Sequence, residues 1–339
     1  MSDRLKTLVV GSGWGRNHAI AYQSHPDAEL MGICGRTASD RNTGLAHELQ
    51  VPLLLGLEEA INRTQPDIVS IATKEPGHEA ATRLSLAAGC HVYCEKMLAD
   101  SVAAAERMVA VAKRTGKQLM TGYNYRFSPS ALKLKQLVQQ GALGDIAFCT
   151  ALTFGYCLHH TLDLLCCLLG DVEEVYCVLN TSPADNTSVP YEVYQEFAYS
   201  ASKCRSIHLK FRCGAIGTLI SSDYMRVGHP AVRVDIVGSK ARCNMTDIAG
   251  PVTTYRENRE ADLFLPSLIL DRFDLPSTTQ AAVTAFVDAI RDGRPVPVSG
   301  EEGLNRLIVE RALMQSVKSN QPVRLSGREG GIPELRRLP

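Results

Sequence analysis

The sequence predicts two parts of different fold class: a doubly wound α/β domain with a parallel sheet over residues 1–122, and an α+β domain built on a large, mostly antiparallel sheet over residues 123–339. Two observations predict the first part: short apolar runs alternate with amphipathic segments, and three closely spaced glycines follow the first run. One observation predicts the second part: its β-rich runs are joined by short turns, as in hairpins.

In the first part, strands and helices alternate at the pace of parallel βαβ units. The apolar run at residues 8–10 is the first strand, and an amphipathic helix begins near His18. Further strands are expected at residues 29–34, 67–72, 91–94 and 118–121, and further helices at residues 43–49, 79–88 and 102–114. This order predicts a Rossmann-type N-terminal domain.

In the second part, the alternation stops after Gly122. A helix at residues 131–140 leads into a strand at 146–154, and hairpins are expected at 206–221 and 232–245. Helices at residues 278–292 and 303–317 close the chain, and residues 328–339, rich in glycine, proline and arginine, are expected to fray.

Length and composition narrow the possible functions. A chain of 339 residues with 45% apolar side chains can fill two cores. Because 36 basic side chains balance 36 acidic ones, neither nucleic acid nor a membrane surface is expected as a partner. Without an apolar leader or a membrane-length apolar run, a cytoplasmic protein is expected. The 11 cysteines include no C-x-x-C pair, so no metal site is predicted.

The glycine turn after the first strand is the strongest functional signal. Gly11, Gly13 and Gly15 would let a pyrophosphate approach the N–H groups at a helix N-terminus, although tight turns use glycine for other reasons as well. Trp14, inside the turn, packs either over the cofactor or in the core. After the second strand stands Arg36 in place of the carboxylate typical of NAD enzymes. Its guanidinium suits the 2′-phosphate of NADP, or stacks on the adenine of NAD.

Two further stretches suggest acid–base chemistry. Glu95, Lys96 and Met97 follow the fourth predicted strand, at the edge where open α/β sheets bind ligands. A partly desolvated lysine there can exchange a proton with a substrate oxygen while hydride moves; the alternative is a surface ion pair. His159 and His160 begin a leucine-rich helix, and adjacent residues cannot face the same way.

Together these motifs, in their order and spacing, resemble the Gfo/Idh/MocA oxidoreductase superfamily (glucose–fructose oxidoreductase, inositol dehydrogenase and rhizopine catabolism) over nearly the whole chain. The matching stretches are the turn from Gly11 to His18; residues 71–73 with His78, like A-T-P-x-x-x-H; Glu95-Lys96-Met97, like E-K-P; residues 123–127, like N-x-R-F; His160 to Asp163, like the end of D-x-x-x-H-x-x-D; and residues 285–299, like F-x-x-A-x-x-x-G-x-x-x-P-V-S.

The resemblance implies an NAD(P)-dependent dehydrogenase acting on a CH–OH group of a sugar, with a nucleotide-sugar 3-dehydrogenase, such as one oxidising UDP-N-acetylglucosamine, as the best candidate. It implies that Lys96 and His160 are catalytic. The expected cofactor residues are Gly11, Gly13, Trp14, Gly15, Arg36, Thr73, His78, Glu95 and Lys96; the expected substrate residues are Asn124, Arg126, Tyr156 and His160. Arg36 leans to NADP, whereas nucleotide-sugar relatives lean to NAD.

Three positions depart from the family pattern. Met97 replaces the proline after Glu-Lys, Tyr156 replaces the aspartate four residues before His160, and the glycine turn is one residue short of G-x-G-x-x-G. A Lys/His pair without the carboxylate occurs in some nucleotide-sugar members.

Two other functions stay open on the sequence. The short segment between Thr150 and His160 suggests a thiazolinyl-type imine reductase, although such relatives tend to carry histidine near the Glu-Lys position. Met97 and Tyr156 fit a non-catalytic NAD(P)-binding regulator. Whatever the function, a large sheet covered on only one face predicts a homodimer or homotetramer.

Overall fold

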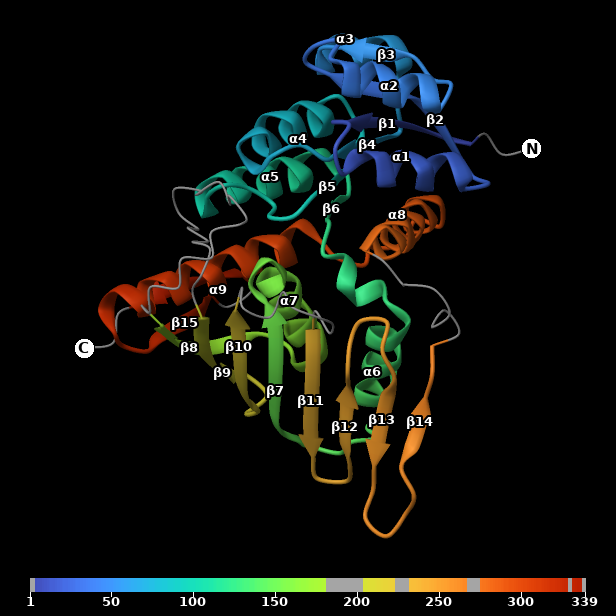
Figure 1. Ribbon diagram of the computed structural model, residues 1–339. Coiled ribbons are helices and arrows are strands. Elements are labelled where there is room, and N and C mark those ends of the chain that lie inside the picture. The colour runs from blue at the N-terminus through green and yellow to red at the C-terminus, as the bar shows by residue number, and fades with distance from the viewer. Residues whose placement is uncertain (1–3, 181–203, 223–231, 267–274, 329–330, 337–339) are drawn as a thin grey trace. The chain divides into compact units, whose positions relative to one another are not determined.

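The computed structural model describes residues 4–180, 204–222, 232–266, 275–328 and 331–336 (Figure 1). The chain forms two compact units. The first comprises Met1–Asn124 and Leu275–Leu307, and the second comprises Tyr125–Asp274 and Ile308–Pro339. Residues 275–307 therefore belong to the first unit as well. The predicted division at residue 122 placed them in the second domain.

The first unit contains a six-stranded parallel sheet in the order β3-β2-β1-β4-β5-β6. Its strands are β1 (Leu5–Val10), β2 (Ala28–Gly35), β3 (Leu53–Leu55), β4 (Ile68–Ile71), β5 (His91–Cys94) and β6 (Leu119–Thr121). This is the order of a Rossmann sheet, which confirms the predicted fold class. The short strand β3 was not predicted from the sequence.

Helices cover the two faces of this sheet (Figure 1). They are α1 (Gly15–Ser24), α2 (Asp40–Glu48), α3 (Leu57–Thr64), α4 (His78–Ala87), α5 (Val102–Thr115), α8 (Leu275–Arg291) and the start of α9 (Gly300–Ser319), with a 3₁₀ turn η1 (Glu75–Gly77) before α4. Helix α4 packs between α3 and α5, and α1 packs against α8. The second contact is reinforced by His25 bound to Asp288 at 3.2 Å and by Asp27 paired with Arg291 at 3.1 Å.

Local sequence signals explain where the helices begin and end. Ser101 accepts a hydrogen bond from the Ala104 N–H and so caps α5, which ends at Gly116 in the left-handed conformation (φ +67°). Ser128 caps α6 (Pro129–Gln139) in the same way, and a proline occupies the first helical position. These caps place the predicted helices within a few residues of their observed bounds.

The second unit contains, within the described residues, a ten-stranded sheet in the order β14-β13-β12-β11-β7-β10-β9-β8-β15-β16. The strands are β7 (Ile146–Phe154), β8 (Val172–Leu179), β9 (Cys204–Phe211), β10 (Ile216–Ser222), β11 (Val232–Gly238), β12 (Arg242–Met245), β13 (Val252–Tyr255), β14 (Asp262–Phe264), β15 (Val323–Arg328) and β16 (Gly331–Arg336). Within this sheet, only β7 and β10 pair in parallel among the described strands, and the other pairs are antiparallel.

Both predicted hairpins are present, as β9 with β10 and β11 with β12. Helix α7 (Leu158–Leu169) packs against β7, and α6 packs against β12 and β13. Along β7, Cys149, Ala151 and Thr153 are buried while Phe148 and Leu152 are exposed, so the helices cover one face only. The expectation of a frayed C-terminus was wrong for residues 331–336, because they form β16 against β15.

Candidate active site

In the first unit, the glycine turn lies tightly against the end of strand β4. Gly11 has φ +98°, and a Cβ atom there would lie 2.7 Å from the Ala72 carbonyl oxygen. A Cβ on Gly15 would lie 3.1 Å from Val9 Cγ1. The backbone conformation and the contact with a main-chain oxygen therefore demand glycine at position 11, whereas a side chain at position 15 would require Val9 to shift. Helix α1 starts at Gly15 without a side-chain cap, and the N–H groups of Arg16 and Asn17 donate to the Gly13 and Trp14 carbonyl oxygens at 3.3 and 2.9 Å. An anion at this end would therefore meet the positive end of the helix dipole and the N–H groups of the turn before Arg16.

Two residues of helix α2 lie at this turn, and one of them also binds the segment after strand β2. Asn42 accepts a hydrogen bond from Ser12 and donates one to the Thr37 carbonyl at 2.7 Å. A Cβ on Gly13 would lie 3.8 Å from the Arg41 guanidinium, so that cation borders the turn. Arg36 is exposed. The sequence singled out Arg36 and missed Arg41, because the turn of α2 that brings position 41 to Gly13 is not a sequence motif.

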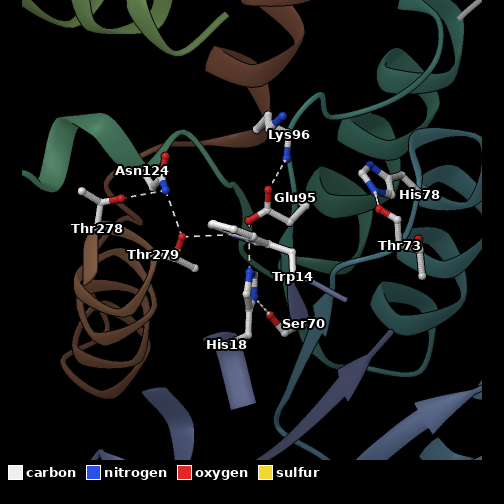
Figure 2. A network of polar contacts seen from close by, with 10 residues as sticks. All are labelled: Trp14, His18, Ser70, Thr73, His78, Glu95, Lys96, Asn124, Thr278 and Thr279. Atoms are coloured by element: carbon white, nitrogen blue, oxygen red, sulfur yellow. Dashed lines mark hydrogen bonds and ion pairs between the residues drawn. The ribbon is translucent and has the colours of Figure 1, made fainter. Parts of the chain in front are cut away.

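Trp14 and Asn124 are both bound to the start of helix α8 (Figure 2). The Trp14 indole N–H donates to Thr279 Oγ1 at 3.2 Å. The Asn124 amide donates to Thr278 Oγ1 at 2.8 Å and to Thr279 Oγ1 at 2.9 Å. These bonds bring together the glycine turn, the end of strand β6 and a helix more than 150 positions away in sequence. Trp14 remains 37% exposed, so it is not a core residue.

Glu95, directly after β5, belongs to a buried polar chain (Figure 2). His18 of α1, fully buried, lies with Nε2 3.0 Å from Glu95 Oε1 and Nδ1 2.7 Å from Ser70 Oγ on β4. The other carboxylate oxygen, Oε2, accepts the backbone N–H of Lys96 at 3.2 Å. Tyr93 packs edge-on against the His18 ring, and burial raises the pKa of that phenol well above its ordinary value.

Lys96 is half-buried between two buried neighbours, Glu95 and Met97. The peptide bond between Lys96 and Met97 is cis. His78, the first residue of α4, is buried, with Nδ1 2.9 Å from the Met97 carbonyl oxygen and Nε2 3.0 Å from that of Thr73. The loops after β4 and β5, which carry Thr73 and Lys96, are therefore joined through His78. These two strands pair directly with one another.

In the second unit, His160 lies in the first turn of helix α7 and is 6% exposed. Its ring stacks on that of Tyr125, with centroids 4.4 Å apart and planes 16° apart. The Tyr125 hydroxyl in turn donates to Cys157 Sγ at 2.9 Å. Sequence reasoning missed Tyr125, although it lies within the family-like stretch at residues 123–127. The side chain of Tyr156 lies outside the described part of the chain.

Arg126 forms a buried, bidentate ion pair with Asp163. The distances are 2.6 Å from Nε to Oδ2 and 2.5 Å from Nη2 to Oδ1, and the two side chains are 7% and 0% exposed. Because Asp163 lies one turn after His160, the pair holds the start of α7 against η2 (Asn124–Phe127). The predicted contact of Arg126 with the substrate stays a prediction; in the structure, Arg126 binds Asp163.

Comparison with known families agrees with this architecture. Residues 5–123 match the model described as an oxidoreductase family, NAD-binding Rossmann fold, and residues 153–325 match its C-terminal alpha/beta domain. The chain belongs to the Gfo/Idh/MocA oxidoreductase family. The family resemblance predicted from the motifs is thereby confirmed, whereas specificity for a nucleotide sugar is not supported by the comparisons.

Named relatives of this Gfo/Idh/MocA chain are dehydrogenases. Myo-inositol 2-dehydrogenase of Thermotoga maritima is 25% identical over 94% of this chain and 97% of its own length. D-glucoside 3-dehydrogenase of Escherichia coli is 28% identical over 46% of this chain and 45% of its own length. D-apiose dehydrogenase of Paraburkholderia graminis is 31% identical over 42% of this chain and 38% of its own length. The chain thus matches less than half the length of the last two.

Solved structures share the fold of this family member over almost its whole length. A levoglucosan dehydrogenase in complex with NADH and levoglucosan has a TM-score of 0.82 at 17% identity, covering 95% of this chain and 99% of that one. An oxidoreductase from Agrobacterium radiobacter in complex with NAD+, L-tartaric acid and magnesium also scores 0.82, at 18% identity, covering 95% and 98%.

The first unit fits a dinucleotide on its own geometry. A helix N-terminus without a side-chain cap, a turn with three glycines and the Arg41 cation suit a pyrophosphate. Within the described ranges, no group of three or more His, Cys, Asp or Glu side chains could hold a metal ion. None of the helices described combines the length and apolar character needed to cross a bilayer.

Proposed function

We propose that this chain is an NAD(P)-dependent dehydrogenase that interconverts a secondary alcohol and a ketone on a sugar or cyclic polyol. One observation carries the proposal: the glycine turn before α1 and the half-buried Lys96 follow strands β1 and β5, whose carboxyl ends share one edge of the sheet with that of β4. Ligands of open α/β sheets bind at that edge. The names of the inositol and glucoside dehydrogenases support the substrate class.

NAD(P), when bound, supplies the acceptor or donor of hydride. The backbone N–H groups of the glycine turn before α1 and the guanidinium of Arg41 would hold its phosphates, while Trp14, Thr73 and Asn124 border the same edge. Lys96 accepts the proton of the substrate hydroxyl or returns it to the ketone oxygen. The Glu95 carboxylate accepts a hydrogen bond from the Lys96 backbone N–H and so holds the backbone at that position. His160 assists in that proton transfer as a second proposed catalytic residue.

The variant Lys96→Ala tests this assignment. Loss of a general acid–base group typically costs about 10²- to 10⁴-fold in kcat, so a fall of at least about 100-fold is expected, with cofactor affinity retained. Lys113→Ala is the matched control, because that lysine on α5 is 64% exposed. Wild-type turnover by a folded, cofactor-binding Lys96→Ala variant on the best substrate would refute the assignment.

The finer proposal, a nucleotide sugar as substrate, is tested with a panel. Inositols, glucosides, free sugars, UDP-N-acetylglucosamine and cyclic imines are compared with NAD and with NADP by absorbance at the nicotinamide band. A preference for UDP-N-acetylglucosamine supports the finer proposal, and a preference for free polyols or glycosides overturns it. Turnover of imines alone would identify an imine reductase. Bound NADH that no member consumes would identify a regulator.

We also propose that two or more copies of this chain associate through the open face of the ten-stranded sheet. Phe148 and Ile216, neighbours on β7 and β10, are 41% and 60% exposed, and Leu152 is 39% exposed beside them. The face can pair with itself about a two-fold axis, which covers these side chains. Light scattering is expected to give a dimer or tetramer that Phe148→Asp dissociates. The control Leu132→Asp alters a 50% exposed leucine on α6. A wild-type monomer at micromolar concentration contradicts the proposal.

A further inference from the structure

His78 lies between two loops of the first unit and contacts the main chain of both. Its Nε2 lies 3.0 Å from the Thr73 carbonyl oxygen, in the loop after β4, and its Nδ1 lies 2.9 Å from the Met97 carbonyl oxygen, in the loop after β5. The side chain is fully buried, with 0% exposure. Figure 2 shows the ring turned toward Thr73.

These two partners determine the proton count of the ring. A carbonyl oxygen only accepts hydrogen bonds, and a neutral imidazole carries a single N–H. In the neutral form, one ring nitrogen would direct its lone pair at a carbonyl oxygen inside the protein, which is costly away from water. Turning the ring over does not help, because both carbonyls would then face C–H groups. Only an imidazolium donates to both oxygens.

The charged and titratable groups around the ring agree with this count. Burial alone lowers the pKa of His78, but the sulfur of Cys94 on β5, the Thr73 carbonyl and the Glu75 carboxylate of η1 oppose that effect and raise the pKa to about 10. On α4 itself, Glu79 is occupied by ion pairs with Arg83 and Arg107. The groups that raise the pKa of His78 therefore come from β5, from the loop after β4 and from η1.

We propose that His78 is a permanently charged positioning residue, a buried imidazolium that holds the loop of Thr73 at a fixed distance from the loop of Lys96. Both ring nitrogens are committed to the main chain, so His78 acts on the cofactor through these loops instead of by contact. The importance of the two loops rests on the proposed dehydrogenase function, whereas the charge of the ring does not.

The charge is measured on the wild-type chain labelled with ¹⁵N-histidine. Two-bond ¹H–¹⁵N spectra distinguish an imidazolium from either neutral tautomer, and the His78→Gln variant assigns the signal among the nine histidines. One histidine is expected to keep protons on both ring nitrogens at pH 8, and its signal is absent from the variant. The proposal is overturned if the His78 ring is neutral at pH 8, or if its titration midpoint lies near the ordinary histidine pKa of about 6.5. If the variant fails to fold, a wild-type spectrum in which no histidine carries two ring protons at pH 8 still overturns the proposal. If one does, His18→Gln removes another buried histidine, which faces a carboxylate, and loss of the signal from that variant also overturns the proposal.

The positioning role is measured by fluorescence titration with NADH and with NADPH. Glutamine can donate to only one of the two carbonyls, so His78→Gln is expected to weaken binding about tenfold with unchanged circular dichroism. His47→Gln is the matched control, since His47 is exposed on α2. Unchanged affinity in a folded His78→Gln variant overturns the positioning role. If wild-type protein binds neither nucleotide, the dehydrogenase proposal fails, while the NMR result still decides the charge of His78.

Discussion

Replacement of His18 by leucine is expected to destabilise the first unit through the buried chain that ends at Glu95. The variant removes the 3.0 Å bond to the Glu95 carboxylate and the 2.7 Å bond to Ser70. A hydrogen bond to a charged group contributes about 1.5–3 kcal/mol and a neutral one about 1 kcal/mol. Because Glu95 is only 6% exposed, water cannot replace the lost donor. The expected loss in unfolding free energy is therefore about 2–4 kcal/mol.

Urea unfolding followed by fluorescence measures this loss directly. Trp14 is the single tryptophan of the chain and lies in the same unit, so its emission reports the unfolding of that unit. With a slope of about 2–3 kcal/mol per molar urea, the midpoint is expected to fall by about 1 M. The control His47→Leu alters an exposed histidine on α2 and is expected to shift it little.

A double-mutant cycle separates the bond to Glu95 from a general packing defect. Combining His18→Leu with Glu95→Leu is expected to cost less than the sum of the single changes, by about 1–3 kcal/mol, because the second change removes the stranded carboxylate. Additive costs, or a His18→Leu variant as stable as the His47→Leu control, would refute the reasoning.

Three further predictions concern other described contacts. Asp163→Asn leaves the Arg126 guanidinium buried without its carboxylate and is expected to cost about 3 kcal/mol or more in thermal unfolding; a cost below about 1 kcal/mol contradicts a buried pair. Burial lowers the pKa of His91 to about 4, so the folded chain binds fewer protons than the unfolded chain between that value and about 6.5, and stability falls as the pH falls through this window. Since His91 is partly exposed, the difference in unfolding free energy between pH 7 and pH 4.5 should be only about 1 kcal/mol smaller in His91→Gln than in the wild type. An identical pH dependence of the wild type and His91→Gln would contradict the lowered pKa of His91. Arg41→Ala is expected to weaken nucleotide binding about tenfold in the NADH and NADPH titrations, because the guanidinium borders Gly13; equal affinity would remove Arg41 from the site.

Much of the fold follows from short-range patterns in the sequence. The βα alternation up to residue 121 and the two hairpins depend on hydrophobic periodicity and on turn residues, which are local properties. The three-residue strands β3 and β14 were not predicted, because they are too short to show a period and form on the hydrogen bonds that neighbouring strands supply. The return of residues 275–307 to the first unit likewise depends on contacts such as His25 with Asp288, 263 positions apart.

Residue types and their spacing along a strand-turn-helix unit were enough to predict the family, the glycine turn and the candidacy of Lys96. The partners of these residues became known only from the folded chain. Ser70, His18 and Glu95 form a chain, Thr278 and Thr279 receive Trp14 and Asn124, and His78 meets two carbonyls. Each of these bonds depends on the direction of a donor toward an acceptor from another segment of the chain, and that direction is fixed only when the segments pack together.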